Sequence, residues 1–314
     1  MSLIPRGSVI AVTGATGFIG QVLCSELLQQ GYRVRALARS HLKARHLARQ
    51  GINIVEGDLG NASALHQLVS GSVAVIHAAG AVRGASREDF DRINVNGTAA
   101  LLAEVLSQAK PPRFMLLSSL AAREPQLSWY AASKRAGEDL VCGHPDLDWV
   151  IVRPPAVYGP GDKEMLPVFQ AMARGFAPVP GEAGARISLI HVLDLVAALG
   201  ASLRCEAARH ETLTPCDGKA DGYDWHEMAD LVADVWGRKV RLWQIPYWLL
   251  DSVAWANVRS ARLTGRAPML TPPKLRELRH DNWVVDNTTI SDITGWRPEI
   301  DLRKGLEELR KAEL

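Results

Sequence analysis

Short apolar runs alternate with longer, mixed stretches through the first half of the chain. The apolar runs predict strands at Val9–Thr13, Val34–Ala38, Asn53–Val55, Val73–His77, Phe114–Ser118 and Trp149–Val152. The stretches between them predict helices at Gln21–Gln30, Leu42–Gln50, Ala62–Val69, Arg87–Ala109 and Trp129–Val141. Strands joined by helical crossovers pair in parallel, and a parallel sheet is covered on both faces. The predicted fold class is therefore α/β, with a doubly wound parallel sheet.

The character of the sequence changes after Arg153. Prolines and glycines interrupt regular periodicity there, and seven of the nine tryptophans lie beyond residue 220. This change predicts a first domain over residues 1–153 and a smaller, mainly substrate-binding lobe over residues 154–314. A further strand at Ile187–Val192 and a helix at Leu193–Ser202 indicate that residues 186–203 return to the first domain.

A glycine-rich loop directly follows the first predicted strand. Gly14, Gly17 and Gly20 have the spacing G-x-x-G-x-x-G and lead into a helical stretch. A strand, loop and helix of this kind begin a Rossmann fold, because glycines permit the tight turn and let backbone N–H groups approach a pyrophosphate. Turn chemistry alone is the alternative interpretation. The expected cofactor contacts in this loop are Gly14, Thr16, Gly17, Phe18, Ile19 and Gly20.

The residues after the second predicted strand bear on the choice of cofactor. An acidic residue at this edge would bind the ribose 2′-hydroxyl of NAD, whereas an arginine can pair with the 2′-phosphate of NADP. Arg39 occupies the position here, and Lys43 and Arg45 add positive charge. The pattern favours NADP(H), with NAD(H) as the second choice. A solvated, basic start of a helix is the interpretation without a cofactor.

Candidate catalytic side chains lie at the fifth strand and the helix after it. Tyr130 and Lys134 are four residues apart in a predicted helix and therefore share one face. A nearby lysine cation is expected to lower the tyrosine pKa, so that the phenol exchanges a proton near neutral pH. Ser118 and Ser119 lie at the edge of the sheet where ligands bind, and Ser119 is favoured for holding a substrate oxygen. The alternative to a catalytic role is that Tyr130 and Lys134 form a solvated surface pair and that the two serines form an ordinary turn at the end of the strand.

These motifs together resemble an extended short-chain dehydrogenase/reductase, of the NAD-dependent epimerase/dehydratase family. The resemblance covers nearly the whole chain, with matching segments T-G-x-x-G-x-x-G, G-D-L, H-A-A-G, N-V-N-G-T, R-P-P-A-V-Y-G-P and I-H-V-L-D-L. It implies that Asn94 belongs to the catalytic set, that Asp58 reaches the adenine, and that Lys134 holds the nicotinamide ribose. The further cofactor contacts that it implies are Leu59, Ala78, Ala79, Pro154 and Val157.

The chain departs from this family's pattern in two places. Only eleven positions separate Ser119 from Tyr130, fewer than the extended family usually has. Nucleotide-sugar enzymes of the family also carry an asparagine that touches the substrate diphosphate, where this chain has Pro154-Pro155-Ala156. A buried anion without a polar partner is unfavourable, so this departure favours a mainly apolar substrate. Arg186 and Arg259 remain as candidates for recognising an anion.

The expected activity is hydride transfer between the nicotinamide and a carbonyl or hydroxyl carbon of a mainly apolar small molecule. Tyr130 would supply or accept the proton, and Ser119 would position the oxygen. The alternative is a nucleotide-sugar epimerase, dehydratase or reductase. A NAD(P)-binding module without turnover is a third class, against which an intact Ser-Tyr-Lys set argues.

Composition and charge bear on nucleic-acid binding, membrane attachment, metal binding and location. The 314 residues carry a formal net charge of +2 with both signs mixed, which indicates neither a nucleic-acid surface nor a membrane anchor. The four cysteines have no metal-binding spacing, so no metal and a reducing, cytoplasmic location are expected. No apolar run has the length of a membrane span. The expected partner is a small-molecule substrate, and a homodimer is one possible assembly.

Overall fold

A seven-stranded parallel sheet forms the centre of the computed structural model, which describes residues 4–264, 268 and 270–312. The strand order is β11-β6-β5-β4-β1-β2-β3, and every neighbouring pair is parallel. The strands are β1 (Val9–Thr13), β2 (Arg33–Ala38), β3 (Asn53–Glu56), β4 (Ala74–His77), β5 (Arg113–Leu117), β6 (Trp149–Val152) and β11 (Glu211–Leu213). The predicted doubly wound α/β fold is confirmed.

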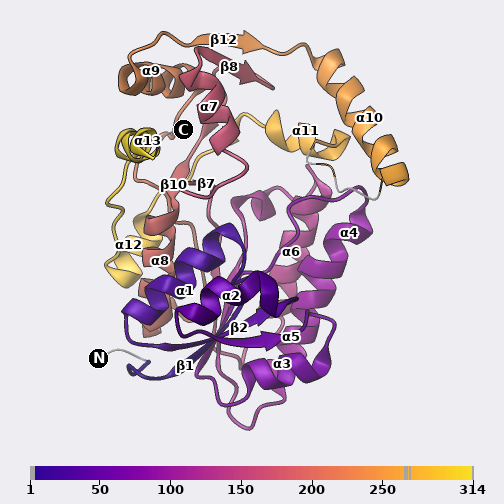
Figure 1. Ribbon diagram of the computed structural model, residues 1–314, viewed down its shortest axis with the longest axis vertical. Coiled ribbons are helices and arrows are strands. Elements are labelled where there is room, and N and C mark those ends of the chain that lie inside the picture. The colour runs from indigo at the N-terminus through magenta and orange to yellow at the C-terminus, as the bar shows by residue number, and fades with distance from the viewer. Residues whose placement is uncertain (1–3, 265–267, 269, 313–314) are drawn as a thin grey trace.

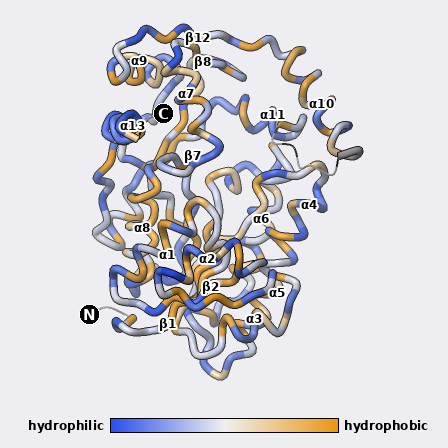
Figure 2. The backbone as a smooth tube through the Cα atoms, in the orientation of Figure 1, coloured by the Kyte–Doolittle hydropathy of each residue, from blue (hydrophilic) through white to orange (hydrophobic). Residues whose placement is uncertain are grey.

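Helices cover both faces of the sheet because its strands are apolar on both sides. Ile10 and Val12 of β1 enter one core, and Ala11 between them enters the other. Figure 2 shows the resulting concentration of hydrophobic residues in the central strands. The first core takes side chains from α1 (Phe18–Gln29), α2 (His41–Arg49) and α8 (Val192–Arg204). The second takes them from α3 (Ala62–Val69), α5 (Gly97–Leu106) and α6 (Trp129–Cys142).

The C-terminal lobe lies above the sheet in Figure 1 and has a core of its own. Tyr158, Phe169 and Leu306 are buried in this core. Its short strands are β7 (Ala156–Tyr158), β8 (Phe176–Val179), β9 (Arg186–Ile187), β10 (Leu189–His191), β12 (Arg241–Gln244) and β13 (Asn282–Trp283). Its helices are α7 (Leu166–Ala173), α9 (Trp225–Trp236), α10 (Tyr247–Thr264), α11 (Pro272–Leu278) and α13 (Leu302–Lys311). Helix α12 (Thr288–Thr294) instead lies beside α8, and its Ile290 is buried in the first core of the sheet domain.

The predicted helix Arg87–Ala109 is continuous in the structure from Arg87 to Leu106, but it is not α-helical throughout. It consists of α4 (Arg87–Asp91), a π-helical turn η1 (Arg92–Asn96) and α5. Gly137 of α6 packs against this turn so closely that a Cβ there would lie 2.7 Å from the Asn94 carbonyl oxygen. The π turn therefore brings Asn94 against the helix that carries Tyr130 and Lys134.

Two smaller differences concern element boundaries, and a third is a strand that was not predicted. Helix α1 begins at Phe18 rather than Gln21, because the glycine loop itself supplies its N-cap. The predicted strand Ile187–Val192 is divided between β9 and β10. Strand β11 was not predicted, because its three residues, Glu211–Leu213, have too little apolar periodicity to identify a strand.

Candidate active site

The glycine loop between β1 and α1 has the geometry that phosphate binding requires. Gly14 has a φ of +75°, and a Cβ there would lie 2.5 Å from the Ala78 carbonyl carbon. A Cβ at Gly20 would lie 2.1 Å from the Gly14 carbonyl oxygen. Gly17 caps the 12-residue helix α1 without a side-chain hydrogen bond, so no side chain occupies the N–H groups of its first turn. These groups are therefore free to face a pyrophosphate.

The loop after β4 is held by Asn94 of the π turn. The Asn94 Oδ1 accepts from the Ala81 N–H at 2.8 Å, and its Nδ2 donates to the Ala81 carbonyl at 3.0 Å. The same Nδ2 donates to Ser133 Oγ of α6 at 2.9 Å. Gly80, next to Ala81 in this loop, lies close to both side chains: a Cβ there would be 3.4 Å from Asn94 Oδ1 and 3.8 Å from Lys134 Nζ. Asn94 thus joins the loop that the resemblance assigns to the cofactor with the helix of Lys134.

A buried hydrogen-bonded chain links the first strand to the π turn. Thr98 Oγ1 donates to the Asn94 carbonyl at 2.8 Å, so its oxygen accepts from His77 Nε2, 3.0 Å away. Burial, together with the Lys134 cation, lowers the pKa of His77 to about 3, so the ring is neutral and its Nδ1 accepts from Thr13 Oγ1 at 2.6 Å. Thr13 Oγ1 in turn accepts from the Ala79 N–H at 3.2 Å. This chain gives His77 a positioning role.

The two serines after β5 have different surroundings. Ser118 is buried, and its hydroxyl donates to the carboxylate of Glu138, which Arg153 also binds. Ser119 is half-buried and caps the next turn through the Ala121 N–H at 3.2 Å, and its hydroxyl acts to lower the Tyr130 pKa. The buried Ser118 hydroxyl is bound to Glu138, so the preference for Ser119 as the residue that faces the tyrosine stays a prediction.

The ionisation of Tyr130 differs from the sequence-based expectation. Burial raises the pKa of Tyr130 to about 12; the Ser119 hydrogen bond opposes this, and the Glu277 carboxylate adds to it. Lys134 Nζ donates to the Leu117 carbonyl of β5 at 2.7 Å, and burial lowers the Lys134 pKa to about 8 against the pull of Glu138. The expected lowering of the tyrosine pKa by Lys134 is wrong in this structure. At neutral pH the site holds a phenol beside a lysine cation.

A charged pair from the C-terminal lobe lies against the tyrosine. Lys274 Nζ of α11 is 5.4 Å from the centroid of the Tyr130 ring and forms an ion pair with Glu277. The other Glu277 oxygen accepts from Ser128 Oγ at 2.6 Å, and Ser128 caps the helix that carries Tyr130. Sequence reasoning missed this pair, because a K-x-x-E spacing on a short helix is typical of a solvated face. Glu138 was also missed, although its place four residues after Lys134 is a signal that it shares the catalytic face.

The short segment between Ser119 and Tyr130 is tied to the C-terminal lobe. It forms a 3₁₀ turn, η2 (Leu120–Arg123). The Arg123 guanidinium donates to the Val284 carbonyl at 2.9 Å and lies 5.5 Å from the centroid of the Trp283 ring. The trimmed loop is therefore held at β13.

The remaining expected cofactor contacts surround the same edge of the sheet. Arg39 follows β2, is exposed, and lies one residue before Ser40, the N-cap of α2. Asp58 is exposed and accepts the Gly60 N–H at 2.9 Å. The others comprise exposed Thr16, half-buried Phe18, Ile19, Ala78, Ala79 and Val157, and buried Leu59 and Pro154.

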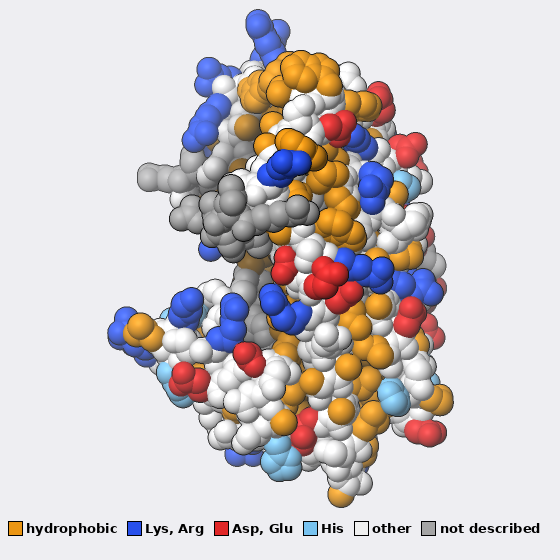
Figure 3. Space-filling view, turned by 90° about the vertical axis from the view of Figure 1, so that its right-hand side faces the viewer, with side chains coloured by type: hydrophobic (Ala, Val, Ile, Leu, Met, Phe, Trp, Pro, Cys, Tyr) orange, Lys and Arg blue, Asp and Glu red, His pale blue; other side chains and the backbone are white. Residues whose placement is uncertain are grey.

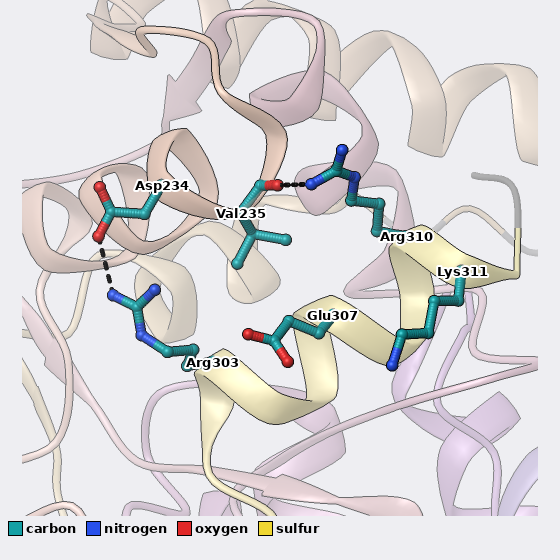
Figure 4. Close-up of a pocket in the computed structure, with 6 residues that line it drawn as sticks. All are labelled: Asp234, Val235, Arg303, Glu307, Arg310 and Lys311. Carbon is teal, nitrogen blue, oxygen red and sulfur yellow. Dashed lines mark hydrogen bonds and ion pairs between the residues drawn. The ribbon is translucent and has the colours of Figure 1, made fainter.

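A surface hollow lies away from these residues. It has a volume of about 390 Å³ and lies between α9 and α13 (Figure 4). Arg303 pairs with Asp234 at 2.8 Å, and Arg310 donates to the Val235 carbonyl, so these two arginines hold the walls of the hollow together. None of the expected site residues lines it.

Metal-binding clusters and membrane-spanning helices are both absent from the described part of the chain. Among the described residues, no cluster of three or more histidine, cysteine or acidic side chains is arranged to bind a metal ion. No described helix combines the length and the apolar character needed to cross a membrane.

Comparison with known proteins agrees with the geometry. The family model described as "NAD dependent epimerase/dehydratase family" matches residues 10–212. The chain is 41% identical to the ceramide reductase of Caulobacter vibrioides, over 93% of this chain and 90% of the relative. It is 30% identical to the 2-alkyl-3-oxoalkanoate reductase of Stenotrophomonas maltophilia, over 67% and 68%.

Solved structures share the fold. The UDP-glucuronic acid 4-epimerase of Bacillus cereus, solved in complex with UDP-glucuronic acid and NAD, superposes with a TM-score of 0.74 at 20% identity. The match covers 97% of this chain and 99% of that one. The predicted fold and family resemblance are both confirmed, and membership of the NAD-dependent family indicates a nicotinamide cofactor.

Proposed function

The chain belongs to the NAD-dependent epimerase/dehydratase family, and from this premise we propose that it is an NADP(H)-dependent reductase of apolar ketones. The substrate class is a carbonyl compound flanked by long alkyl chains. Two reductases among its relatives are named for such compounds, a ceramide and a 2-alkyl-3-oxoalkanoate. A nucleotide-sugar substrate remains the alternative from the same family.

The observation that carries the proposal is the arrangement of Ser119, Tyr130 and Lys134. Because the Tyr130 pKa is about 12, the phenol keeps its proton at neutral pH and can donate it to a carbonyl oxygen as that oxygen gains negative charge. The Ser119 hydroxyl acts on the Tyr130 pKa and would hold the same carbonyl oxygen. The Lys134 cation then stabilises the phenolate that proton donation leaves. This protonation state favours the direction of reduction.

The residues present fit a nicotinamide dinucleotide. The N-terminus of α1, whose Gly17 cap has no side chain, would hold the pyrophosphate. The close packing of Gly14 on Ala78 would hold the glycine loop next to the loop after β4. Lys134, near Gly80, would hold the nicotinamide ribose. The cofactor, when bound, supplies the hydride. Every other part of the proposed reaction belongs to the side chains at β5 and α6.

The preference for NADP(H) rests on Arg39. Its guanidinium is exposed at the end of β2, where a 2′-phosphate would lie in a Rossmann fold. Lys43 and Arg45 on α2 are also exposed and add positive potential. Figure 3 shows the molecule hollowed between its two lobes, with Lys and Arg side chains along the lower rim of the hollow.

The preference for an apolar substrate rests on where the cations are engaged. Arg186, a sequence candidate for anion recognition, pairs with Glu227 at 2.9 Å and with Asp224 at 3.4 Å. Arg259, the other candidate, lies over the solvent-exposed Trp255 ring, 4.0 Å from its centroid. A diphosphate at Arg186 would have to displace the two carboxylates, and Pro154-Pro155 offers no backbone N–H in their place.

The test is a paired substrate screen with the purified chain. Long-chain β-keto compounds and hydrophobic ketones are offered with NADPH and with NADH, against a panel of UDP-, GDP- and dTDP-sugars. We expect saturable oxidation of NADPH with the apolar set. Turnover of a nucleotide sugar with no response to any apolar ketone would overturn the proposal in favour of the alternative.

A further inference from the structure

Helix α10 (Tyr247–Thr264) carries apolar side chains on two opposite faces. Its inner face holds Leu250 and Ala254, which pack with Leu275 of α11 in a small core. Trp248 and Trp255 lie seven residues apart, about two turns, and therefore share the other face. The exposed fraction of Trp248 is 70% and that of Trp255 is 56%. Two large indoles thus face solvent on the side away from the core.

A cation extends this outer face. Arg259 lies four residues after Trp255, and its guanidinium is 4.0 Å from the centroid of that ring. The acidic residue closest in sequence on this helix, Asp251, forms an ion pair with Arg279 of α11 at 3.0 Å, so its charge is matched internally. The outer face is defined by Trp248, Trp255 and Arg259, and its net character is aromatic and basic.

The segment that leads into α10 has the same composition. Phe176 of β8 and Trp243 of β12 are partly exposed, at 39% and 48%, and their rings stack with centroids 5.4 Å apart. Arg241 of β12 is also exposed. Figure 3 shows hydrophobic side chains gathered on the upper part of this face, with Lys and Arg side chains among them. These two rings add exposed aromatic side chains next to the start of α10, and exposed apolar patches are typical of interaction surfaces.

We propose that the outer face of α10 docks on the surface of an anionic lipid bilayer. Tryptophan is favoured at the boundary of water and hydrocarbon, because its ring is apolar and its N–H is polar. Arginine beside it meets the phosphate of a lipid headgroup. Asp251 also lies on this side of α10, but its carboxylate is already paired with Arg279. Among the described residues of the helix, a symmetric pair of chains would therefore bring two Arg259 cations together without an unpaired carboxylate to match them, which opposes a second copy as the occupant.

The docking face is connected to the candidate active site through helix α11. Helix α10 packs on α11 through Leu275, and α11 places Lys274 against the Tyr130 ring. A substrate with long alkyl chains is held in a bilayer, so a reductase that acts on it gains from resting on that surface. This delivery role rests on the proposed function, whereas the docking itself does not.

The experiment measures binding of the full chain to vesicles without cofactor or substrate. Vesicles of phosphatidylcholine alone are compared with vesicles that contain an equal amount of phosphatidylglycerol. The test variants are Trp248→Ala with Trp255→Ala, and separately Arg259→Glu. The matched control replaces two exposed leucines of the other domain, Leu42→Ala with Leu106→Ala, whose exposed fractions are 73% and 38%.

We expect the wild type and the leucine control to sediment with the anionic vesicles. The double tryptophan variant should bind at least about tenfold more weakly, because it loses the apolar area that enters the interface. Arg259→Glu should weaken binding to anionic vesicles and leave the weak binding to neutral ones unchanged. Equal binding by wild type and the double tryptophan variant, or no binding by wild type, would overturn the proposal.

Two further readouts separate docking from catalysis. The variants should reduce a water-soluble, short-chain ketone as fast as wild type, since the outer face is remote from the reacting atoms. Vesicle binding without any ketone reductase activity would contradict the proposed function and leave docking intact. A wild-type dimer that the double tryptophan variant converts to a monomer would assign the face to a second copy and overturn bilayer docking.

Discussion

Ser128 Oγ donates a hydrogen bond of 2.6 Å to the carboxylate of Glu277, 149 positions later in the chain. The same hydroxyl accepts from the Ala131 N–H at 2.9 Å and so caps the catalytic helix α6. Glu277 also pairs with Lys274, which lies against the Tyr130 ring. One side chain of the C-terminal lobe therefore holds the start of the helix on which the tyrosine is placed.

Replacing this carboxylate should weaken the attachment of the lobe. In Glu277→Gln the shape is kept, but the ion pair with Lys274 and the charged acceptor for Ser128 are lost. Hydrogen bonds to charged groups contribute about 1.5–3 kcal/mol, so we expect the free energy of unfolding to fall by roughly this amount in chemical denaturation. Glu307→Gln, at an exposed position on α13, is the control. Equal losses in the two variants would contradict the structural role of Glu277.

Removing the tyrosine hydroxyl should affect turnover far more than folding. Tyr130→Phe keeps the ring against Lys274 but has no proton to donate. We expect the kcat for ketone reduction to fall by about 10²–10⁴-fold, the usual range for a positioned general acid. Tyr247→Phe, which removes an exposed hydroxyl bound to Glu182, should retain normal kcat. A kcat near the wild-type value in Tyr130→Phe would exclude the proposed proton donor.

Replacing each of the two serines after β5 should change a different property, turnover for Ser119 and stability for Ser118. Ser119→Ala removes the hydroxyl that bonds Tyr130, so we expect kcat to fall by at least about tenfold with little change in melting temperature. Ser118→Ala removes a donor from buried Glu138, so the free energy of unfolding should fall by about 1–3 kcal/mol. Measuring kcat and thermal unfolding for both variants shows which serine acts in turnover and which stabilises the fold. The reverse pattern would assign the substrate contact to Ser118.

Cofactor preference should follow the charge at residue 39. In Arg39→Asp a carboxylate faces the expected position of the 2′-phosphate. A charged hydrogen bond of about 1.5–3 kcal/mol is lost and a repulsion is added, so the Kd for NADPH should rise about tenfold or more while that for NADH changes little. Arg49→Asp, at the exposed end of α2, is the matched control. Tighter binding of NADH than of NADPH by the wild type in a direct titration would show that the preference is wrong.

Activity should decline on the alkaline side because of Lys134. Its pKa is lowered to about 8 by burial, so the cation is present below this pH and is lost as the pH rises through it. The Tyr130 pKa of about 12 keeps the phenol protonated across the same range. We expect kcat/KM for reduction to be level below pH 8 and to fall about tenfold per pH unit above it.

A variant that keeps a cation at position 134 tests whether Lys134 causes the decline in kcat/KM above pH 8. Arginine stays protonated up to a pH of about 12 or more, so Lys134→Arg should show no decline near pH 8, whatever activity it retains. A decline that stays at the same pH in Lys134→Arg would assign the titration to another group.

Much of the first domain could be predicted from the sequence because the signals are local. An apolar run buried on both faces, a glycine with positive φ, and a tyrosine and lysine at helical spacing each lie within a few residues of one another. The phosphate loop from Gly14 to Gly20 and the pair Tyr130 and Lys134 were therefore predicted at the positions where the structure brings them to one edge of the sheet.

Other features depend on contacts that no local pattern contains. The π turn at Asn94 forms against Gly137 of α6, and the polar strand β11 is recognisable only beside β6. The placement of Lys274 and Glu277 against the catalytic helix joins segments far apart in the chain.

The ionisation of the candidate site shows the same division. The spacing of Tyr130 and Lys134 was enough to predict that they share a helix face, and this depends only on helix geometry. The direction of the Tyr130 pKa shift was set by burial and by Glu277, and the Lys134 ammonium is directed at the Leu117 carbonyl. The sequence by itself determined that Tyr130 and Lys134 share one face of a helix, and the tertiary structure alone decided their charge, because desolvation depends on every element packed around them.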